Sequence, residues 1–214
     1  MYLILYLFTY SNKFQILSLG LLHVTLGATG GTTYIRWGRT VCPNETGTKL
    51  VYNGIASGSL YYAAGGGANY ICMASGDDVE YHDEATTANL NLATVYAAEY
   101  RMRNGQALDH LLDYTVLCAV CAVSSRSAQV MIPGRLTCPD TWTVEYTGWL
   151  VADRNNLNRA MFICLDKTPE AIIETSPPIE GARMHHNEAA CSSTGLPCPP
   201  FDATKELSCV VCTK

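Results

Sequence analysis

The spacing of the cysteines constrains this chain more than any other feature of its sequence. A Cys-x-x-Cys pair occurs twice, as CAVC at residues 118–121 and as CVVC at residues 209–212. The ten cysteines are Cys42, Cys72, Cys118, Cys121, Cys138, Cys164, Cys191, Cys198, Cys209 and Cys212. An even and dense set of cysteines without haem or iron–sulfur spacing favours disulfides, which persist outside the cytosol.

The cysteine pairs recur because the sequence is duplicated. The matching segments are GRTVCP and GRLTCP (38–43 and 134–139), then Tyr52 with Gly54 and Tyr146 with Gly148, then NYICM and MFICL (69–73 and 161–165), and finally LCAVC and SCVVC. Two tandem copies are too few for a solenoid. We therefore expect a pseudo-two-fold pair of β subdomains, residues 32–123 and 124–214, with Cys191 and Cys198 as an extra pair in the second.

The sequence pattern predicts short strands over most of the chain. Runs rich in Val, Ile, Thr, Tyr and Trp, bounded by Gly, Pro or Asn, are typical of strands. These runs cover residues 32–38, 49–54, 68–74, 114–123, 128–134, 142–151 and 160–165. The Ala- and Leu-containing segment 85–102 is the place where a helix is expected. The sequence predicts an all-β fold with few short helices.

The Cys-x-x-Cys pairs allow three interpretations. A redox site needs a thiolate of lowered pKa, usually at a helix N-terminus, but both pairs lie in apolar, strand-like runs. A zinc site would join two pairs that are much farther apart than in a compact zinc ribbon. In an extended strand, residues i and i+3 point to opposite faces. We therefore favour structural disulfides, in which Cys118 and Cys121 bond to different partners, the Cys-Pro and Ile-Cys cysteines of the same half.

Three other clusters could carry chemistry, and each is better explained structurally. The acidic segment with Asp77, Asp78, Glu80, Asp83 and Glu84 lacks the order of an EF-hand and is interpreted as a solvated loop. The adjacent His185 and His186, with Glu188, would diverge on a strand rather than share a metal. The triple glycine at 65–67 is not followed by GK[ST], so a turn or bulge is expected instead of a phosphate loop. We expect no enzyme, no cofactor and no metal.

Charge and the N-terminus bear on partners and compartment. The net charge is −5 and no basic run occurs, which argues against nucleic acid as a partner. Residues 1–31 are expected to be an apolar, signal-like segment with a collagen-like stub, GATGG, at 27–31. Asn44-Glu45-Thr46 is an acceptor sequence for N-glycosylation, compatible with a secreted glycoprotein.

The segments CPNETGTKLVYNG with LCAVC, and CPDTWTVEYTG with SCVVC, resemble the C-terminal non-collagenous domain of type IV collagen. The ends YIRWGRTVCP and ELSCVVCTK make the chain more similar to the spongin short-chain collagen-related proteins of invertebrates. This resemblance covers residues 32–214. It implies a secreted protein of the extracellular matrix, with two similar β subdomains that exchange strands.

The same resemblance implies a role, partners and a disulfide plan. The family's domain selects and registers three chains and makes network contacts, so self-association as a trimer and binding to other matrix molecules are expected. The family's plan maps onto Cys42–Cys121, Cys72–Cys118, Cys138–Cys212, Cys164–Cys209 and Cys191–Cys198. The chain departs from the family in its collagen part, because GATGG is the only trace of Gly-X-Y, whereas a triple helix needs many repeats.

A carbohydrate-binding module is the alternative function. The chain has 13 Tyr and 3 Trp, which would suit a surface that binds glycans. Trp37, Trp142 and Trp149 lie near the ends of expected strands, however, and we predict that they belong to the core. The matrix role remains the favoured hypothesis.

Overall fold

Nearly all regular structure in the described residues is β-strand, as the runs rich in β-branched and aromatic residues predict. The structure is a computed structural model that describes residues 30–82, 93–102, 107–172 and 181–214. Residues 1–29 of the signal-like segment expected at 1–31 lie outside the described residues. No helix in the described ranges is long and apolar enough to cross a membrane.

Eleven strands and two short 3-10 helices follow one another along the described chain. The first half holds β1 (Thr32–Trp37), β2 (Thr48–Gly58), β3 (Ile71–Ala74), η1 (Gly76–Asp78), β4 (Tyr96–Tyr100), η2 (Asp109–Leu111) and β5 (Thr115–Val123). The second half holds β6 (Gln129–Pro133), β7 (Thr143–Ala152), β8 (Ile163–Asp166), β9 (Ala171–Ile172), β10 (Ala182–His186) and β11 (Ser208–Thr213). The seven runs singled out in the sequence all contain strands.

The two halves repeat the same strand pairings. In the first half, β5 lies between β1 and β2, and β2 also pairs with β3 and β4, all antiparallel. In the second half, β11 lies between β6 and β7, and β7 also pairs with β8 and β10, again antiparallel. The duplication of the sequence is therefore also a duplication of the strand order.

The repeat extends to single residues, which we call counterparts when they hold the same place in the two sets of pairings. Cys118 lies opposite Gly54, and its counterpart Cys209 lies opposite Gly148. Both long strands are interrupted by one unpaired residue at the same place, Val51 on β2 and its counterpart Glu145 on β7. Such a bulge bends the strand and increases its twist.

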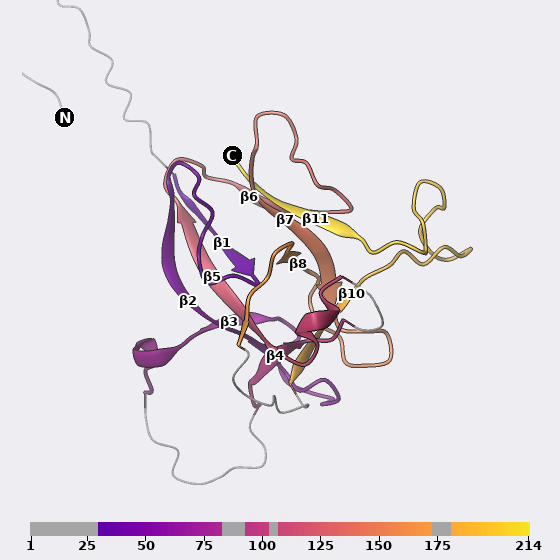
Figure 1. Cartoon of the computed structure of the whole chain (residues 1–214), viewed down its shortest axis with the longest axis horizontal. Helices are drawn as coiled ribbons and strands as arrows, with labels where there is room; N and C mark the ends of the chain where they lie inside the picture. The colour runs from indigo at the N-terminus through magenta and orange to yellow at the C-terminus, as the bar shows by residue number, and fades with distance from the viewer. Residues whose placement is uncertain (1–29, 83–92, 103–106, 173–180) are drawn as a thin grey trace, which may run out of the picture.

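The halves are not separate sheets. Strand β1 pairs in parallel with β8 at Trp37 and Leu165, β10 pairs in parallel with β4, and the short β9 pairs with β5. One mixed sheet therefore runs through both halves, in the order β10-β4-β2-β5-β1-β8-β7-β11-β6 (Figure 1). Strands of the second half complete the first half.

The helix expected over residues 85–102 is wrong where the structure describes that segment. Residues Tyr96–Tyr100 form β4, and residues 85–92 lie outside the described ranges. Strand β4 is held on two sides, by β2 and by β10 from the other half, and this buries Ala98 and Tyr100 completely. Tertiary pairing outweighs the moderate helix propensity of Ala and Leu here.

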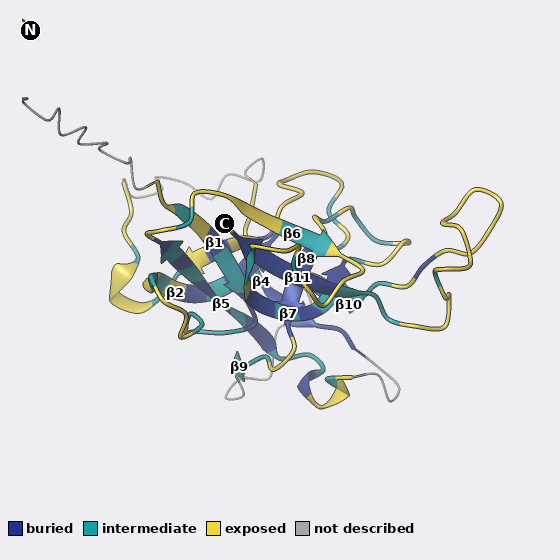
Figure 2. Cartoon of the chain, turned by 90° about the horizontal axis from the view of Figure 1, so that it is seen from above, coloured by how far each residue is buried: buried dark blue, intermediate teal, exposed yellow. Residues whose placement is uncertain are grey.

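Two clusters of buried side chains form the core. Figure 2 shows which segments of the strands are buried. The larger cluster combines both halves, for example Trp37 and Val116 with Val151 and Leu165. The segment between β10 and β11 contrasts with the core, because it extends from the sheet as an arm that is exposed along most of its length (Figures 1 and 2). This arm carries Cys191 and Cys198.

Gly54, opposite Cys118, and Gly148, opposite Cys209, allow the next strand of the sheet to approach closely. A Cβ atom at Gly54 would lie 1.7 Å from the Met73 carbonyl oxygen, and one at Gly148 would lie 1.6 Å from that of Leu165. We expect Gly148→Ala to lower the free energy of unfolding by more than about 3 kcal/mol, because backbone atoms cannot move away cheaply. Thermal unfolding of the purified protein measures this, with Gly65→Ala, where the added Cβ has no described neighbour within 4 Å, as the neutral control. Equal stability of the two variants would contradict the prediction.

Candidate interaction surface

All ten cysteines are paired in five disulfides. The bonds are Cys42–Cys121, Cys72–Cys118, Cys138–Cys212, Cys164–Cys209 and Cys191–Cys198, the pairs that the family resemblance implies. No bond forms inside a Cys-x-x-Cys pair, because the strand directs its two cysteines to opposite faces. The sulfur atoms are thus structural, and no cysteine is left as a thiol.

The two cysteines of β5, and likewise those of β11, bond to partners on two different sides of the strand. Cys121 on β5 bonds Cys42, in the loop after β1, whereas Cys118 bonds Cys72 on β3, which pairs with β2 and not with β5. Strand β11 repeats this arrangement with Cys138 after β6 and Cys164 on β8. The disulfides therefore connect the start, middle and end of each half.

The disulfides that close long loops should stabilise the folded protein more than the disulfide that closes a short loop. In the chain-entropy model, closing the 79-residue separation of Cys42 and Cys121 removes about 4–5 kcal/mol of unfolded-state freedom, and the separation of 7 between Cys191 and Cys198 about 2–3. We expect the double variant Cys42→Ser/Cys121→Ser to lose more secreted protein and more thermal stability than Cys191→Ser/Cys198→Ser. Equal losses in a side-by-side secretion assay would argue against this.

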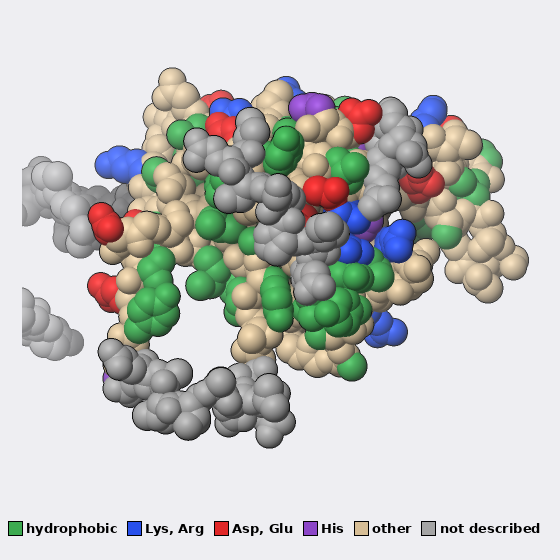
Figure 3. All heavy atoms as spheres, turned by 60° about the horizontal axis from the view of Figure 1, so that its bottom comes forward, with side chains coloured by type: hydrophobic (Ala, Val, Ile, Leu, Met, Phe, Trp, Pro, Cys, Tyr) green, Lys and Arg blue, Asp and Glu red, His purple; other side chains and the backbone are tan. Residues whose placement is uncertain are grey.

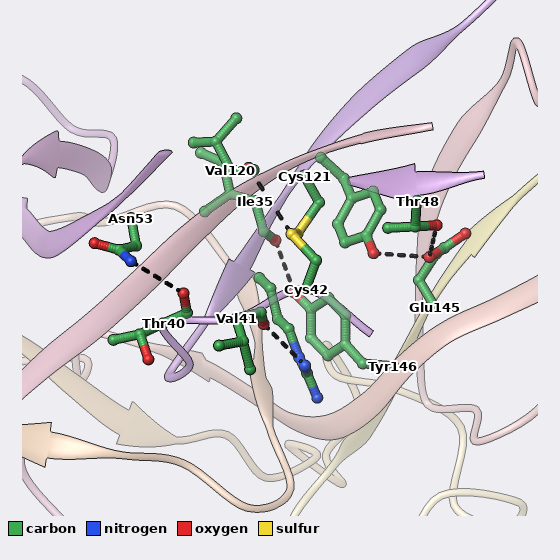
Figure 4. The surroundings of a disulfide bond; sticks show 12 residues. Ile35, Thr40, Val41, Cys42, Thr48, Asn53, Val120, Cys121, Glu145 and Tyr146 are labelled. Atoms are coloured by element: carbon green, nitrogen blue, oxygen red, sulfur yellow. Dashed lines mark hydrogen bonds between the residues drawn. A yellow bond between two sulfur atoms is a disulfide. The ribbon is translucent and has the colours of Figure 1, made fainter. Parts of the chain in front are cut away.

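A buried carboxylate forms the centre of the junction between the halves. Glu145, the bulge residue of β7, is only 4% exposed. It accepts hydrogen bonds from the Tyr34 hydroxyl at 2.7 Å, from Arg126 at 2.8 Å and from Thr213 at 2.5 Å. Burial and the neighbouring Glu145 raise the pKa of Tyr34, so its hydroxyl remains a donor. Figure 4 shows Glu145 beside Thr48, close to the Cys42–Cys121 disulfide.

Ion pairs extend this junction along β1. Arg36 of β1 binds the Asp166 carboxylate at the end of β8, with nitrogen–oxygen distances of 2.8 and 2.7 Å. Next along the chain, Arg39 lies 3.2 Å from Glu170, whose carboxylate also accepts hydrogen bonds from Thr40. These groups complete a polar contact between the β1 side of the first half and the β7–β8 side of the second, which we call the inner junction.

The counterparts of these two sides have no partner strand among the described residues. There, β6, the counterpart of β1, pairs only with β11, and β3, the counterpart of β8, pairs only with β2. A Cβ atom at Gly38 would lie 2.9 Å from Pro169 and 3.0 Å from Leu165, whereas one at its counterpart Gly134 would meet no described residue within 4 Å. The chain thus presents two open sides that correspond to the two sides joined within it.

Several of the exposed hydrophobic residues lie on these open sides. The β3 side carries Leu50, Val51, Ile71, Met73 and Tyr81, and the β6 side carries Val130 and Leu136. Val51 is 56% exposed, although its counterpart Glu145 is buried. Clusters of exposed hydrophobic side chains are also visible on the face drawn in Figure 3. Contiguous apolar surface of this kind marks interaction sites more often than scattered single residues do.

The other candidate residues are placed as follows. Asp77, Asp78 and Glu80 are exposed around η1, and Asp83 and Glu84 lie outside the described residues. The glycines at 65–67 lie in an exposed turn. Asn44 is exposed. Of the tryptophans, Trp37 is buried, while Trp142 and Trp149 are half-buried.

The two histidines of β10 point to different carboxylates. His185 Nε2 lies 3.6 Å from Asp153, and His186 Nδ1 lies 2.9 Å from Glu206. Burial, together with Arg154, Arg101 and Arg183, lowers the pKa of His185 to about 4, so at neutral pH its contact with Asp153 is not an ion pair. Among the described residues, no group of three or more His, Cys, Asp or Glu is arranged to hold a metal ion.

Asp153 should make the stability of the protein depend on pH. Burial raises its pKa to about 6, despite the opposing backbone N–H of Arg154 and the charge of Arg183. In the unfolded chain the carboxyl ionises near its ordinary pKa of about 4, so the folded state binds more protons between these values. The contribution of Asp153 to stability therefore falls as the pH rises through this window.

We expect Asp153→Asn to gain stability relative to the wild type by about 2 kcal/mol between pH 4 and pH 7, since the amide cannot ionise. Chemical denaturation at both pH values measures this. Asp140→Asn, which changes an exposed carboxylate, is the control. A difference between Asp153→Asn and the wild type that stays constant with pH would contradict the assignment.

No family model matches this chain. The site therefore rests on its own geometry. Sequence reasoning missed Glu145, Arg126 and the Arg36–Asp166 pair as elements of the junction. One signal was present in the repeat, where KLVYNG carries Val51 and the matching TVEYTG carries a charged Glu145 in the same strand.

Proposed function

We propose that this chain is a structural domain of the extracellular matrix that works by associating with further copies of itself and with other matrix molecules. The proposal draws on the resemblance of the chain to the type IV collagen C-terminal domain and to spongin short-chain collagen-related proteins. In this view the domain joins chains and carries out no catalysis.

The observation that carries the proposal is the pair of open sides. Each is the counterpart of a side that is already paired at the inner junction. Val51 and Met73 are exposed, for example, whereas their counterparts Glu145 and Leu165 are buried. The β6 side of one copy can therefore meet the β3 side of the next copy in the way that β1 meets β8 within the chain. Unpaired strand edges of this kind are templates for pairing with another chain.

Such a contact is head-to-tail, because it uses a different surface on each copy. Repeated head-to-tail contacts generate a ring when the rotation closes and a filament when it does not. If each outer contact repeats the rotation between the halves, every half takes an equivalent place in the assembly. The expected number of three chains comes from the family resemblance.

Two observations support secretion. Five disulfides in a chain of this size are typical of proteins that fold in an oxidising compartment. The acceptor Asn44 is exposed in the loop that follows Cys42, where a glycan would not disturb the core. Both features fit the proposed matrix role.

Sedimentation of the secreted chain tests self-association. We expect the wild type to sediment as a concentration-dependent trimer. Met73→Glu on the β3 side and Leu136→Glu on the β6 side, which are 40% and 59% exposed, should each yield monomers, because a charge would be buried in the contact. Leu196→Glu, on the projecting arm, is the matched control and should still associate.

Mixing the two interface variants tests the head-to-tail arrangement. Met73→Glu keeps an intact β6 side and Leu136→Glu keeps an intact β3 side. An equimolar mixture should therefore form a 1:1 dimer that neither variant forms alone, and that does not grow further. A monomeric wild type would refute the proposed function, and a mixture that stays monomeric would refute the arrangement.

A further inference from the structure

The inner junction and its open counterparts differ in chemistry at the same places. Within the chain, the Tyr34 hydroxyl donates to the buried carboxylate of Glu145. The counterpart of Tyr34 on β6 is Val130, because Tyr34 lies opposite Cys121 as Val130 lies opposite Cys212. The counterpart of Glu145 is Val51. A polar pair at the inner junction thus corresponds to two exposed valines on the open sides.

The second position shows the same exchange. Arg36 and Asp166 form a nearly buried ion pair at the inner junction. Arg36 lies opposite Ala119 on β5, and its counterpart Ile132 lies opposite Val210 on β11. Asp166 lies opposite Gly148, and its counterpart Ala74 lies opposite Gly54. An ion pair is therefore matched by two small or apolar residues.

The third position keeps its charges. Arg39 pairs with Glu170 at the inner junction. In the repeat, Arg135 follows Gly134 as Arg39 follows Gly38, and Asp78 stands as far beyond Cys72 as Glu170 beyond Cys164. Arg135 and Asp78 are both exposed. The two open sides are thus complementary in charge at their rim and apolar at their centre.

We infer that these positions form a pairing code that keeps the two kinds of junction apart. The contact between copies, which we call the outer junction, seats Val130 of one chain on Val51 of the next and Ile132 on Ala74, with Arg135 beside Asp78. This inference rests on the proposed function and adds which residues meet and why each half accepts only one partner.

The code follows from what a wrong pairing would bury. If β6 of one copy took the place of β1, Val130 would face Glu145 and Ile132 would face Asp166, and both carboxylates would lose partners. If β1 docked on the β3 side of another copy, Arg36 would lie against Ala74 without its counter-ion. A buried charge that loses its partner is strongly unfavourable, whereas two matched apolar surfaces are not. The polar set therefore joins halves of one chain, and the apolar set joins chains.

The test transfers one pair of the inner junction to the outer junction. Val51→Glu places a carboxylate at the counterpart of Glu145. Because Val51 is exposed, the single chain should still fold normally. We expect the association constant to fall at least about a hundredfold, because the carboxylate would be buried against Val130. Adding Val130→Tyr in the same chain recreates the Tyr34–Glu145 pair at every outer junction. We expect this second substitution to raise the association constant of Val51→Glu at least about tenfold. Val51→Thr and Val130→Tyr alone are the controls.

Sedimentation equilibrium measures the association, and thermal unfolding of each variant verifies that it is folded. Recovery by Val130→Tyr only in the presence of Val51→Glu supports the code. Unchanged association of Val51→Glu overturns it, as does loss without recovery, even if Met73→Glu and Leu136→Glu behave as expected and the proposed function stands. A monomeric wild type would overturn both.

Discussion

Each half of this protein depends on one central strand whose two cysteines bond in opposite directions. Strand β5 lies between β1 and β2, and its disulfides reach the loop after β1 and the strand beyond β2. Strand β11 does the same in the second half. The close approach of β3 to Gly54 and of β8 to Gly148 completes this unit. Every other element of a half is placed relative to it.

The two copies of the unit have become different at the bulge. Val51 of the first copy faces solvent, whereas Glu145 of the second is buried among Tyr34, Arg126 and Thr213. The difference is not intrinsic to the strand, because the two bulges have the same register. It arises because the first half covers the second at Glu145, whereas none of the residues that the structure describes covers Val51 in the same way.

Within the described residues, the two copies of the unit meet at the inner junction. The inner junction joins β1 to β8 and aligns three polar positions. The open β3 and β6 sides hold the same positions with largely apolar residues. A chain with this arrangement buries Glu145 and Asp166 internally and leaves apolar side chains exposed on the two open sides.

The sequence by itself determined the all-β character, the duplication and the division of each Cys-x-x-Cys pair between two partners, since these follow from local composition and the two-residue period of strands. Even the choice among partners needed a family resemblance, because spacing cannot distinguish Cys42 from Cys72 as the partner of Cys121. Only the tertiary structure decided that residues 96–100 form a strand, that β8 and β10 complete the first half, and that Glu145 is buried while Val51 is exposed. These features depend on contacts between residues far apart in the chain, and such contacts leave little trace in local sequence patterns.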